Sequence, residues 1–300
     1  MIIVNLTGGL GNQLFQYATG RSVACKNNDE LKLDVRRYLK QDDSREDFFM
    51  RTVDTPRDYK LNHFNITAGI ASTDEAAALK NPYGPLSEVY RIVRAKVTQN
   101  YWTNYHPEIF KKKDNLYLNG FWQTELYFKD IRDTLLKELT LKIPLEQIVP
   151  DLLEMMKGPE SVSLQIRRGD YVDNPVYNRY WGTCTASYYT RALAHIAEQT
   201  SGSLRVFAFS DDPEWVEHNI SLPPNTCIVS KTYALKDYEE LIAMSYCSHN
   251  IISNSTFGWW GAWLNNNPDK VVVAPTPWTD LHKDRHKDII PESWIQLPKY

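Results

Sequence analysis

The chain has 300 residues, of which 42% are hydrophobic and 24% are charged, and its formal net charge is −3. This composition is typical of a globular protein and argues against a disordered one. The near balance of charge argues against a general nucleic-acid or anionic-membrane binder, which normally carries a basic excess. The length is sufficient for two domains.

Four cysteines are scattered along the chain, at Cys25, Cys184, Cys227 and Cys247, and no Cys-x-x-Cys pair occurs. They therefore predict neither a zinc site nor a disulfide framework. The N-terminal residues MIIVNLTGG lack the basic region of a signal peptide, and no apolar run reaches the roughly 18 residues that a membrane span needs. We expect no transmembrane segment.

The first half of the chain opens with an apolar run, Ile2–Leu6, which predicts a strand. A glycine-rich turn at Thr7–Gly11 leads into a helix, because Leu10, Leu14 and Ala18 are spaced to share one face. Residues 34–85 are polar and irregular. A strand is predicted again at Leu116–Phe121, and a helix at Lys129–Glu138.

The second half alternates short β-branched runs with helical patterns, which indicates a doubly wound α/β domain with buried parallel strands. Lys157-Gly158-Pro159 is the best candidate linker, so we place one domain at 1–157 and the second at 158–300, with a tail that can pack back on the first. Strands are expected at 162–166, 206–209, 228–229, 250–252 and 271–274, and helices at 187–199, 213–219, 237–247 and 258–265. Ligands of such sheets bind beyond the carboxyl ends of the strands.

The first polar segment at a strand end is Gln165-Ile166-Arg167-Arg168-Gly169-Asp170-Tyr171. Arginine is permanently charged and its planar fork of donors suits phosphate oxygens. A pair of arginines there could offset the charge that grows on a departing diphosphate. The alternative is a surface basic pair that forms salt bridges with Asp170.

The next strand is followed by Ser210-Asp211-Asp212-Pro213. Asp212 before Pro213 has the pattern of an N-cap followed by proline at the first helical position. Asp211 is then left to accept hydrogen bonds, for example from the N1 and N2 donors of guanine. Adjacent aspartates can also indicate a metal site, but the chain contains no Asp-x-Asp motif, so we expect no metal.

A third polar segment, Ser253-Asn254-Ser255-Thr256-Phe257, joins a buried strand to a tryptophan-rich helix. Free N–H groups and the positive end of the helix dipole make such a start a binding site for phosphate, and Ser255 and Thr256 add hydroxyl donors. In the simpler interpretation Ser255 only caps the helix. For Trp259 and Trp260 we favour packing in the core.

Two segments of the first half also carry candidate ligand groups. Gly8-Gly9-Leu10-Gly11-Asn12-Gln13 is only a partial dinucleotide fingerprint, because Leu14 stands where its third glycine belongs, so NAD is not favoured. The segment Asn119–Phe128 places aromatic rings beside amides and a carboxylate, a combination that suits sugar faces and hydroxyls. It could equally brace a domain interface.

These five segments, which follow one another along the chain in the family's order, resemble the α-1,2-fucosyltransferase family, in its bacterial, inverting, GDP-fucose-dependent form. Gln165–Tyr171 is similar to the family's His-x-Arg-Arg-Gly-Asp-Tyr motif, and Ser255–Trp263 reproduces its Ser-x-Phe-x-Trp-Trp-Gly-Ala-Trp pattern nearly intact. The family usually has histidine where this chain has Gln165, which cannot titrate near neutral pH. The resemblance implies a GT-B-like α/β fold with two facing Rossmann-like domains and an interdomain cleft.

The resemblance further implies inverting transfer of L-fucose from GDP-β-L-fucose to the 2-hydroxyl of a galactose-terminated oligosaccharide, in the cytoplasm, with GDP-fucose as co-substrate and no other cofactor, metal or nucleic acid. Two rivals are a transferase with another acceptor, such as a peptide hydroxyl, and a non-catalytic glycan-binding protein. Asp170 and Glu125 are the conceivable bases for the acceptor proton. The residues that the resemblance assigns are, as catalytic, Arg167, Arg168 and Asp170; as donor-binding, Gly9, Gly11, Asn12, Asp211, Ser255, Thr256 and Phe257; as acceptor-binding, Gln13, Trp122, Gln123 and Glu125.

Overall fold

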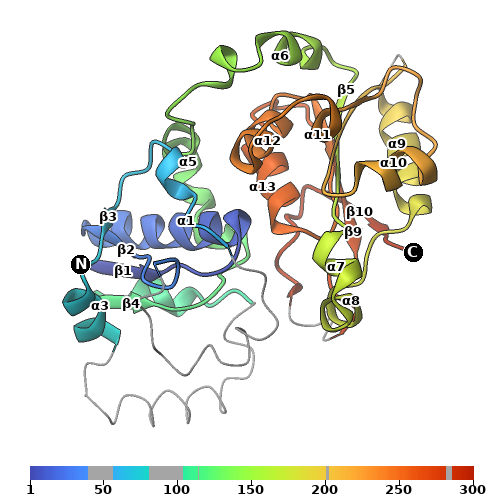
Figure 1. The fold of residues 1–300 in the computed structure, drawn as a ribbon. Helices are drawn as coiled ribbons and strands as arrows, with labels where there is room; N and C mark the ends of the chain where they lie inside the picture. The colour runs from blue at the N-terminus through green and yellow to red at the C-terminus, as the bar shows by residue number, and fades with distance from the viewer. Residues whose placement is uncertain (40–56, 81–103, 114, 201–202, 282–285) are drawn as a thin grey trace. The chain divides into compact units, whose positions relative to one another are not determined.

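The computed structural model describes residues 1–39, 57–80, 104–113, 115–200, 203–281 and 286–300, and these residues form two α/β units (Figure 1). Unit 1 comprises Met1–Leu139 and Arg285–Ile289. Unit 2 comprises Thr140–Asp284 and Ile290–Tyr300. Each unit has its own parallel sheet.

Unit 1 is built on a sheet with the strand order β3-β2-β1-β4. The strands are β1 (Ile2–Asn5), β2 (Leu31–Asp34), β3 (Gly69–Ile70) and β4 (Leu116–Leu118), and all their pairings are parallel. Ile2, Ile3 and Val4 are fully buried, as a β-branched run in a central parallel strand should be. The helices are α1 (Leu10–Asn27), α3 (Thr73–Lys80) and α5 (Arg132–Glu138), with short 3₁₀ turns at Leu61–His63, Pro107–Lys111, Glu125–Tyr127 and Lys129–Ile131.

Unit 2 contains a larger parallel sheet with the order β10-β9-β8-β5-β6-β7. Its strands are β5 (Ser161–Ile166), β6 (Arg205–Ser210), β7 (Cys227–Ile228), β8 (His249–Ile251), β9 (Val272–Thr276) and β10 (Ile295–Pro298). Helices α9 (Ala186–Gln199) and α10 (Pro213–Asn219) cover one face, and α11 (Val229–Thr232), α12 (Asp237–Met244) and α13 (Thr256–Leu264) cover the other (Figure 1). Shorter elements are η6 (Leu145–Gln147), α6 (Pro150–Met156), α7 (Gly169–Asp173) and α8 (Pro175–Trp181).

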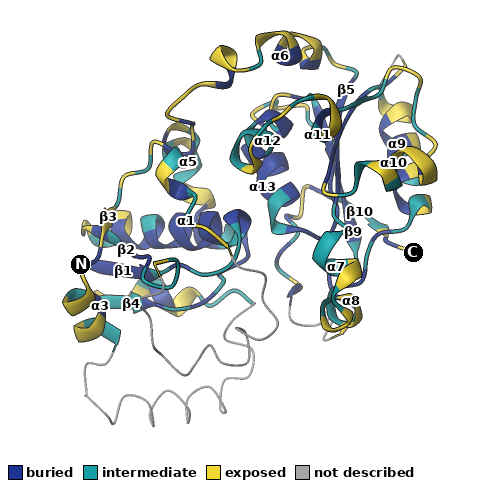
Figure 2. Ribbon diagram, in the orientation of Figure 1, coloured by how far each residue is buried: buried dark blue, intermediate teal, exposed yellow. Residues whose placement is uncertain are grey.

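The central strand β5 is buried along its whole length, and Figure 2 shows the central strands of unit 2 buried between its helices. Alternate side chains of a strand point to opposite faces. Val162, Leu164 and Ile166 therefore join the apolar core under α9 and α10. Ser163 and Gln165 point to the other face, toward the helices that include α13. The position of each residue within β5 therefore determines the face of the sheet on which its side chain lies.

The predicted α/β, GT-B-like class with Rossmann-like domains is confirmed, since each unit is a parallel sheet with helices packed on it. The expected strands and helices are present, with ends that differ by a few residues; for example, β4 ends at Leu118, before the predicted Phe121. Of the irregular segment 34–85, residues 40–56 and 81–85 lie outside the described part. None of the helices in the described ranges combines the length and apolar character needed to cross a bilayer.

The division between the units falls between Leu139 and Thr140, whereas the glycine–proline signal places the linker at 157–159. The reason is that the intervening segment packs within unit 2. Helix α6 buries Leu152, Leu153 and Met156, and the hydroxyl of Tyr246 donates to Glu146 at 2.6 Å. The chain also returns to unit 1 at residues 285–289, where Asp288 accepts from the backbone N–H of Tyr105 at 3.1 Å.

Candidate active site

The strand order of unit 2 reverses at β5. The next strands in the chain, β6 and β7, lie on one side of β5, and β8, β9 and β10 lie on the other. In open parallel sheets, ligands bind outside the carboxyl ends of the strands at such a switch point. The loops that follow β5 and β8 are therefore the expected site in this unit, and they carry Arg167–Asp170 and Ser253–Thr256.

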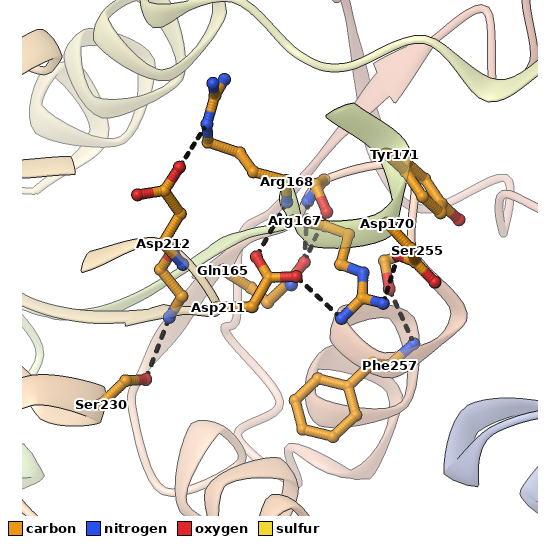
Figure 3. Close-up of polar contacts among 12 residues, drawn as sticks. Gln165, Arg167, Arg168, Asp170, Tyr171, Asp211, Asp212, Ser230, Ser255 and Phe257 are labelled. Atoms are coloured by element: carbon orange, nitrogen blue, oxygen red, sulfur yellow. Dashed lines mark hydrogen bonds and ion pairs between the residues drawn. The ribbon is translucent and has the colours of Figure 1, made fainter. Parts of the chain in front are cut away.

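Arg167 lies at the centre of this site. Its guanidinium pairs with Asp170 at 2.5 Å and with Asp211 at 2.9 Å. Burial disfavours the charge, but the two carboxylates outweigh it and raise the pKa of Arg167 above its ordinary value. Figure 3 shows this guanidinium directed toward Ser255 and Phe257 at the start of α13. A fixed cation thus stands beside the N-terminus of a helix.

Arg168 points the other way, although it is the next residue. Its Nε pairs with Asp212 at 3.0 Å (Figure 3). Its guanidinium carbon lies 4.0 Å from the centroid of the Trp215 ring on α10. From the sequence alone, either arginine could be the one that contacts a phosphate. The structure separates them, because it is Arg167 that lies beside the α13 start, while Arg168 ties the loop to α10.

Asp211 forms more hydrogen bonds and ion pairs within the protein than its sequence context suggests. Its Oδ1 accepts from the backbone N–H of Arg168 at 2.8 Å, and its Oδ2 pairs with Arg167. A Cβ on Gly169 would lie 2.5 Å from that Oδ2, so this close approach requires a glycine. The predicted guanine contact would have to use the remaining lone pairs of the carboxylate. Asp212 caps α10 as predicted, since its Oδ1 accepts from the N–H of Trp215 at 3.1 Å.

The start of α13 has the expected cap. Ser255 accepts at Oγ from the N–H of Phe257 at 3.3 Å, and its hydroxyl hydrogen stays available as a donor. The first turn of a helix carries N–H groups without partners inside the helix, and its dipole favours an anion there. Thr256 and Phe257 are half-buried at this end. Trp259 and Trp260 are fully buried, as predicted.

The turn before Ser255 contains residues that motif reading did not single out. Asn254 donates from Nδ2 to the backbone carbonyls of Trp181, Gly182 and Trp278, at 2.9, 3.2 and 3.0 Å. Lys299 is fully buried and donates to the Trp181 carbonyl at 2.6 Å. These partners lie up to 118 residues apart in the chain. No local sequence signal could have paired them.

Glu240 on α12 is a further residue that the sequence did not indicate. Burial raises the pKa of its carboxyl, a hydrogen bond with Ser230 opposes this, and the nearby charges of Asp237 and Asp211 add to the rise. The Ser230 hydroxyl also accepts from the N–H of Ser210 at 3.0 Å, at the end of β6. An acidic residue in a helix pattern is normally read as solvated, so its burial had no signal.

In unit 1 the strand order reverses at β1, which lies between β2 and β4. The predicted residues of this unit gather at that switch point. Asn12, near the start of α1, accepts at Oδ1 from Nε2 of Gln123 at 2.8 Å, which joins the loops that follow β1 and β4. Gly9 is the N-cap of α1, and Gly11 is buried in its first turn.

Three further residues predicted to bind the acceptor also lie in unit 1. Gln13 is fully buried and its amide is in use: Nε2 donates to the Gly8 and Asp58 carbonyls, and Oε1 accepts from the N–H of Lys60. Its amide holds residues 58–60 against α1, and the predicted sugar contact stays a prediction. Trp122 is buried edge-on against Tyr127, which favours bracing within unit 1. Glu125 begins a 3₁₀ turn and is half-buried.

No group of three or more His, Cys, Asp or Glu side chains within the described ranges is arranged to hold a metal ion. The adjacent pair Asp211 and Asp212, which sequence alone could assign to a metal, bonds to the two arginines instead. The four cysteines are free, and Cys184 and Cys247 are buried, where burial raises the pKa of the Cys184 thiol to about 12. They act as small apolar side chains.

Comparison with known proteins identifies the family. The model of glycosyl transferase family 11 matches residues 87–298. An α-1,2-colitosyltransferase of Escherichia coli is 30% identical, with 100% of this chain and 99% of the relative covered. The O-antigen biosynthesis glycosyltransferase WbnK of Escherichia coli is 33% identical over 97% and 99%. A galactoside α-(1,2)-fucosyltransferase 1 of Leontocebus fuscicollis is 24% identical over 53% of this chain and 45% of the relative. The chain therefore belongs to glycosyl transferase family 11, and its resemblance to the α-1,2-fucosyltransferases is confirmed.

Proposed function

We propose that this glycosyltransferase moves L-fucose from GDP-β-L-fucose to the 2-hydroxyl of a terminal β-galactoside, with inversion and without a metal. The family supports glycosyl transfer, and the α-1,2 linkage is that of two relatives. Guanine, fucose and the galactose acceptor come from the sequence motifs and from the name of the more distant relative. A cytoplasmic location stays a prediction.

The observation that carries the proposal is the position of Arg167 beside the Ser255-capped start of α13, at the switch point of unit 2. As the sugar bond breaks, negative charge grows on the departing diphosphate. A guanidinium, two hydroxyls and the N–H groups of a helix start would offset that charge without reorganising. Asp170 and Asp211 hold Arg167 in place for this role.

The acceptor hydroxyl must lose its proton when it attacks the anomeric carbon. Asp170 is paired with Arg167 at 2.5 Å, so we assign it to orienting the arginine. Glu125 of unit 1 is then the candidate base that remains from the sequence motifs. Replacing Glu125 by glutamine, which keeps the shape and removes the basic oxygen, tests that assignment, because loss of a general base costs about 10²–10⁴-fold in turnover.

Colitose is the second candidate for the transferred sugar, since a colitosyltransferase is 30% identical over the whole chain. Both sugars would use the same diphosphate site, and they differ in the hydroxyls that the protein would contact. The arrangement around Arg167 is therefore compatible with either donor, and the choice is an experimental one.

A donor-by-acceptor screen tests the proposal. The full chain is incubated with GDP-fucose or GDP-colitose and with lactose, N-acetyllactosamine or a serine-containing peptide, and the new linkage is located by NMR. We expect an α-1,2 bond to galactose. Transfer to the peptide would establish the rival acceptor class. Binding of lactose without GDP affinity and without product would establish a glycan-binding protein and overturn the proposal.

A further inference from the structure

Gln165 occupies the position in β5 that lies between the core of the sheet and the arginine loop. It is two residues before Arg167 and has an exposed fraction of only 4%. Its side chain points to the face of the sheet that α13 covers. A buried amide in the centre of a parallel sheet needs hydrogen-bond partners to be tolerated, so its partners indicate its role.

The partners of Gln165 belong to the turn that precedes α13. Its Oε1 accepts from Oγ of Ser253 at 2.6 Å and from the backbone N–H of Ser253 at 3.3 Å. Ser253 is itself fully buried, and its carbonyl accepts from the N–H of Ser255 at 2.8 Å. Ser255 in turn caps α13 through Phe257. One continuous set of hydrogen bonds therefore runs from β5 to the start of the helix.

The first turn of α13 also packs directly on Gln165. A Cβ on Gly258 would lie 2.5 Å from Oε1 of Gln165, so the glycine lets the helix approach this amide. The side chain is thus held between two donors of the turn and the helix backbone. The amide oxygen of Gln165 therefore joins the loops that follow β5 and β8 to each other.

We propose that Gln165 is a positioning residue: acting through Ser253, it sets the distance between Arg167 and the N-terminus of α13, so that both meet the same phosphate. This inference rests on the proposed function, because it concerns the diphosphate of the donor. It predicts that loss of the amide harms the phosphate-dependent part of binding and leaves the nucleoside part unchanged.

The chain offers a matched control on the same strand. Ser163, two residues earlier on the same face of β5, accepts at Oγ from Nδ2 of Asn250 on β8 at 2.7 Å. Like Gln165–Ser253, this is a buried cross-strand bond between β5 and the β8 segment. It lies away from the carboxyl ends, so Ser163→Ala removes a comparable bond without reaching the loops.

The test compares Gln165→Leu, Ser163→Ala and wild type by calorimetry with GDP and with guanosine, together with thermal unfolding. We expect Gln165→Leu to weaken GDP binding about tenfold and to lower turnover about 10²-fold, as when a positioned group is displaced. Guanosine binding by Gln165→Leu should stay unchanged. Ser163→Ala should keep both its GDP affinity and its turnover. Gln165→His should recover GDP binding at alkaline pH, where a neutral imidazole nitrogen can accept from Ser253.

Ser253→Ala provides a second variant, which keeps the folded strand and removes one of the two donors to Oε1. We expect the same selective loss of GDP affinity, and no further loss when it is combined with Gln165→Leu, since the two residues act together. Equal losses for GDP and guanosine, or a loss no larger than that of Ser163→Ala, would overturn the role of Gln165. Absence of GDP binding in wild type would instead overturn the proposed function itself.

Discussion

Arg167 and Arg168 are neighbours in the chain with opposite surroundings. Arg167 lies between two carboxylates beside α13, and Arg168 lies on the ring of Trp215. We therefore expect Arg167→Ala to lower turnover about 10²-fold or more, by loss of the charge that meets the diphosphate. Arg168→Ala should lower it less, because it acts through loop packing. Initial rates at saturating GDP-fucose measure both.

The control for this pair is Arg205→Ala. Arg205 pairs with Glu160 at 2.5 Å, at the amino end of β6 and thus at the opposite edge of the sheet from the site. Its removal also takes away one ion-paired arginine, and it should leave turnover unchanged. Equal rates for Arg167→Ala and Arg205→Ala would contradict the proposed role of Arg167.

Gly169 is a second residue-scale test. A methyl group there would lie 2.5 Å from Oδ2 of Asp211, so Gly169→Ala should push this carboxylate away from Arg167. We expect a loss of about 1–3 kcal/mol in the free energy of unfolding, as for overpacking, and a fall in turnover. Gly69→Ala is the control, because its Cβ would meet nothing closer than 3.6 Å. Two equally active variants would disprove the steric argument.

At the residue scale, the sequence could predict which residue types gather at the site. It could not predict which of them form hydrogen bonds and ion pairs with other residues of the protein. The Arg-Arg-Gly-Asp segment and Ser255 were found from their types and their places after strands. The engagement of Asp211 and the burial of Gln13 could not be predicted, because both depend on partners more than 40 residues away. A polar residue at a strand end is equally suited to a ligand and to such an internal partner.

Two helices of unit 2 begin with side-chain caps that can be compared at the scale of the element. Ser255 caps α13, and Asp212 caps α10. Replacing either by alanine should cost about 1 kcal/mol in the free energy of unfolding. We expect Ser255→Ala to weaken GDP binding strongly and Asp212→Ala only mildly, because α13 is the helix beside Arg167. Urea unfolding and calorimetry measure the two effects, and equal GDP affinities would contradict the phosphate site at α13.

His249 links β8 to its neighbours in the neutral form. Its Nδ1 accepts from the N–H of Val271 at 3.0 Å, so Nε2 carries the proton and donates to the Pro159 carbonyl. Burial lowers the pKa of His249 below 6.5, against the opposing effect of that carbonyl. The unfolded chain then takes up the proton at higher pH than the folded one. The stability that His249 contributes is complete above about pH 6.5 and is lost as pH falls below it.

The free energy of unfolding of wild type should therefore decrease as the pH falls below about 6.5, with a contribution of at most about 1.4 kcal/mol per pH unit from this residue. His249→Gln should reduce that slope. Identical slopes for wild type and His249→Gln would show that this imidazole does not titrate in the expected range.

At the scale of the element, the hydrophobic pattern was enough to locate β5 to β9 and the helices α9, α10, α12 and α13 of unit 2. It did not indicate β10, an edge strand whose residues alternate between half-buried and exposed, or short helices such as α7, α8 and α11. The pairing order of the strands was not predictable in the same way. It depends on which runs meet in the folded sheet, and the reversal at β5 becomes visible only when β8 is seen beside it.

For the whole molecule, the proposed mechanism places the neutralisation of the diphosphate on protein groups. Asp170, Asp211 and Asp212 are bonded to arginines, and among the described residues no group of three metal ligands is assembled. We expect turnover to be unchanged after exhaustive treatment with EDTA. A loss of activity that manganese restores would contradict the metal-free proposal, and GDP calorimetry before and after treatment would locate the effect in binding or in chemistry.

The residues 285–289 belong to unit 1, although the residues on either side of them belong to unit 2. His286 and Ile289 are buried, and Asp288 holds the backbone of Tyr105. A fragment of the chain that ends at Leu139 would therefore lack part of unit 1. The remaining fragment, which contains unit 2, would carry that part of unit 1 as an insertion. Attempts to express unit 2 by itself should excise this short stretch and supply it to unit 1, as a separate peptide or by circular permutation of the chain.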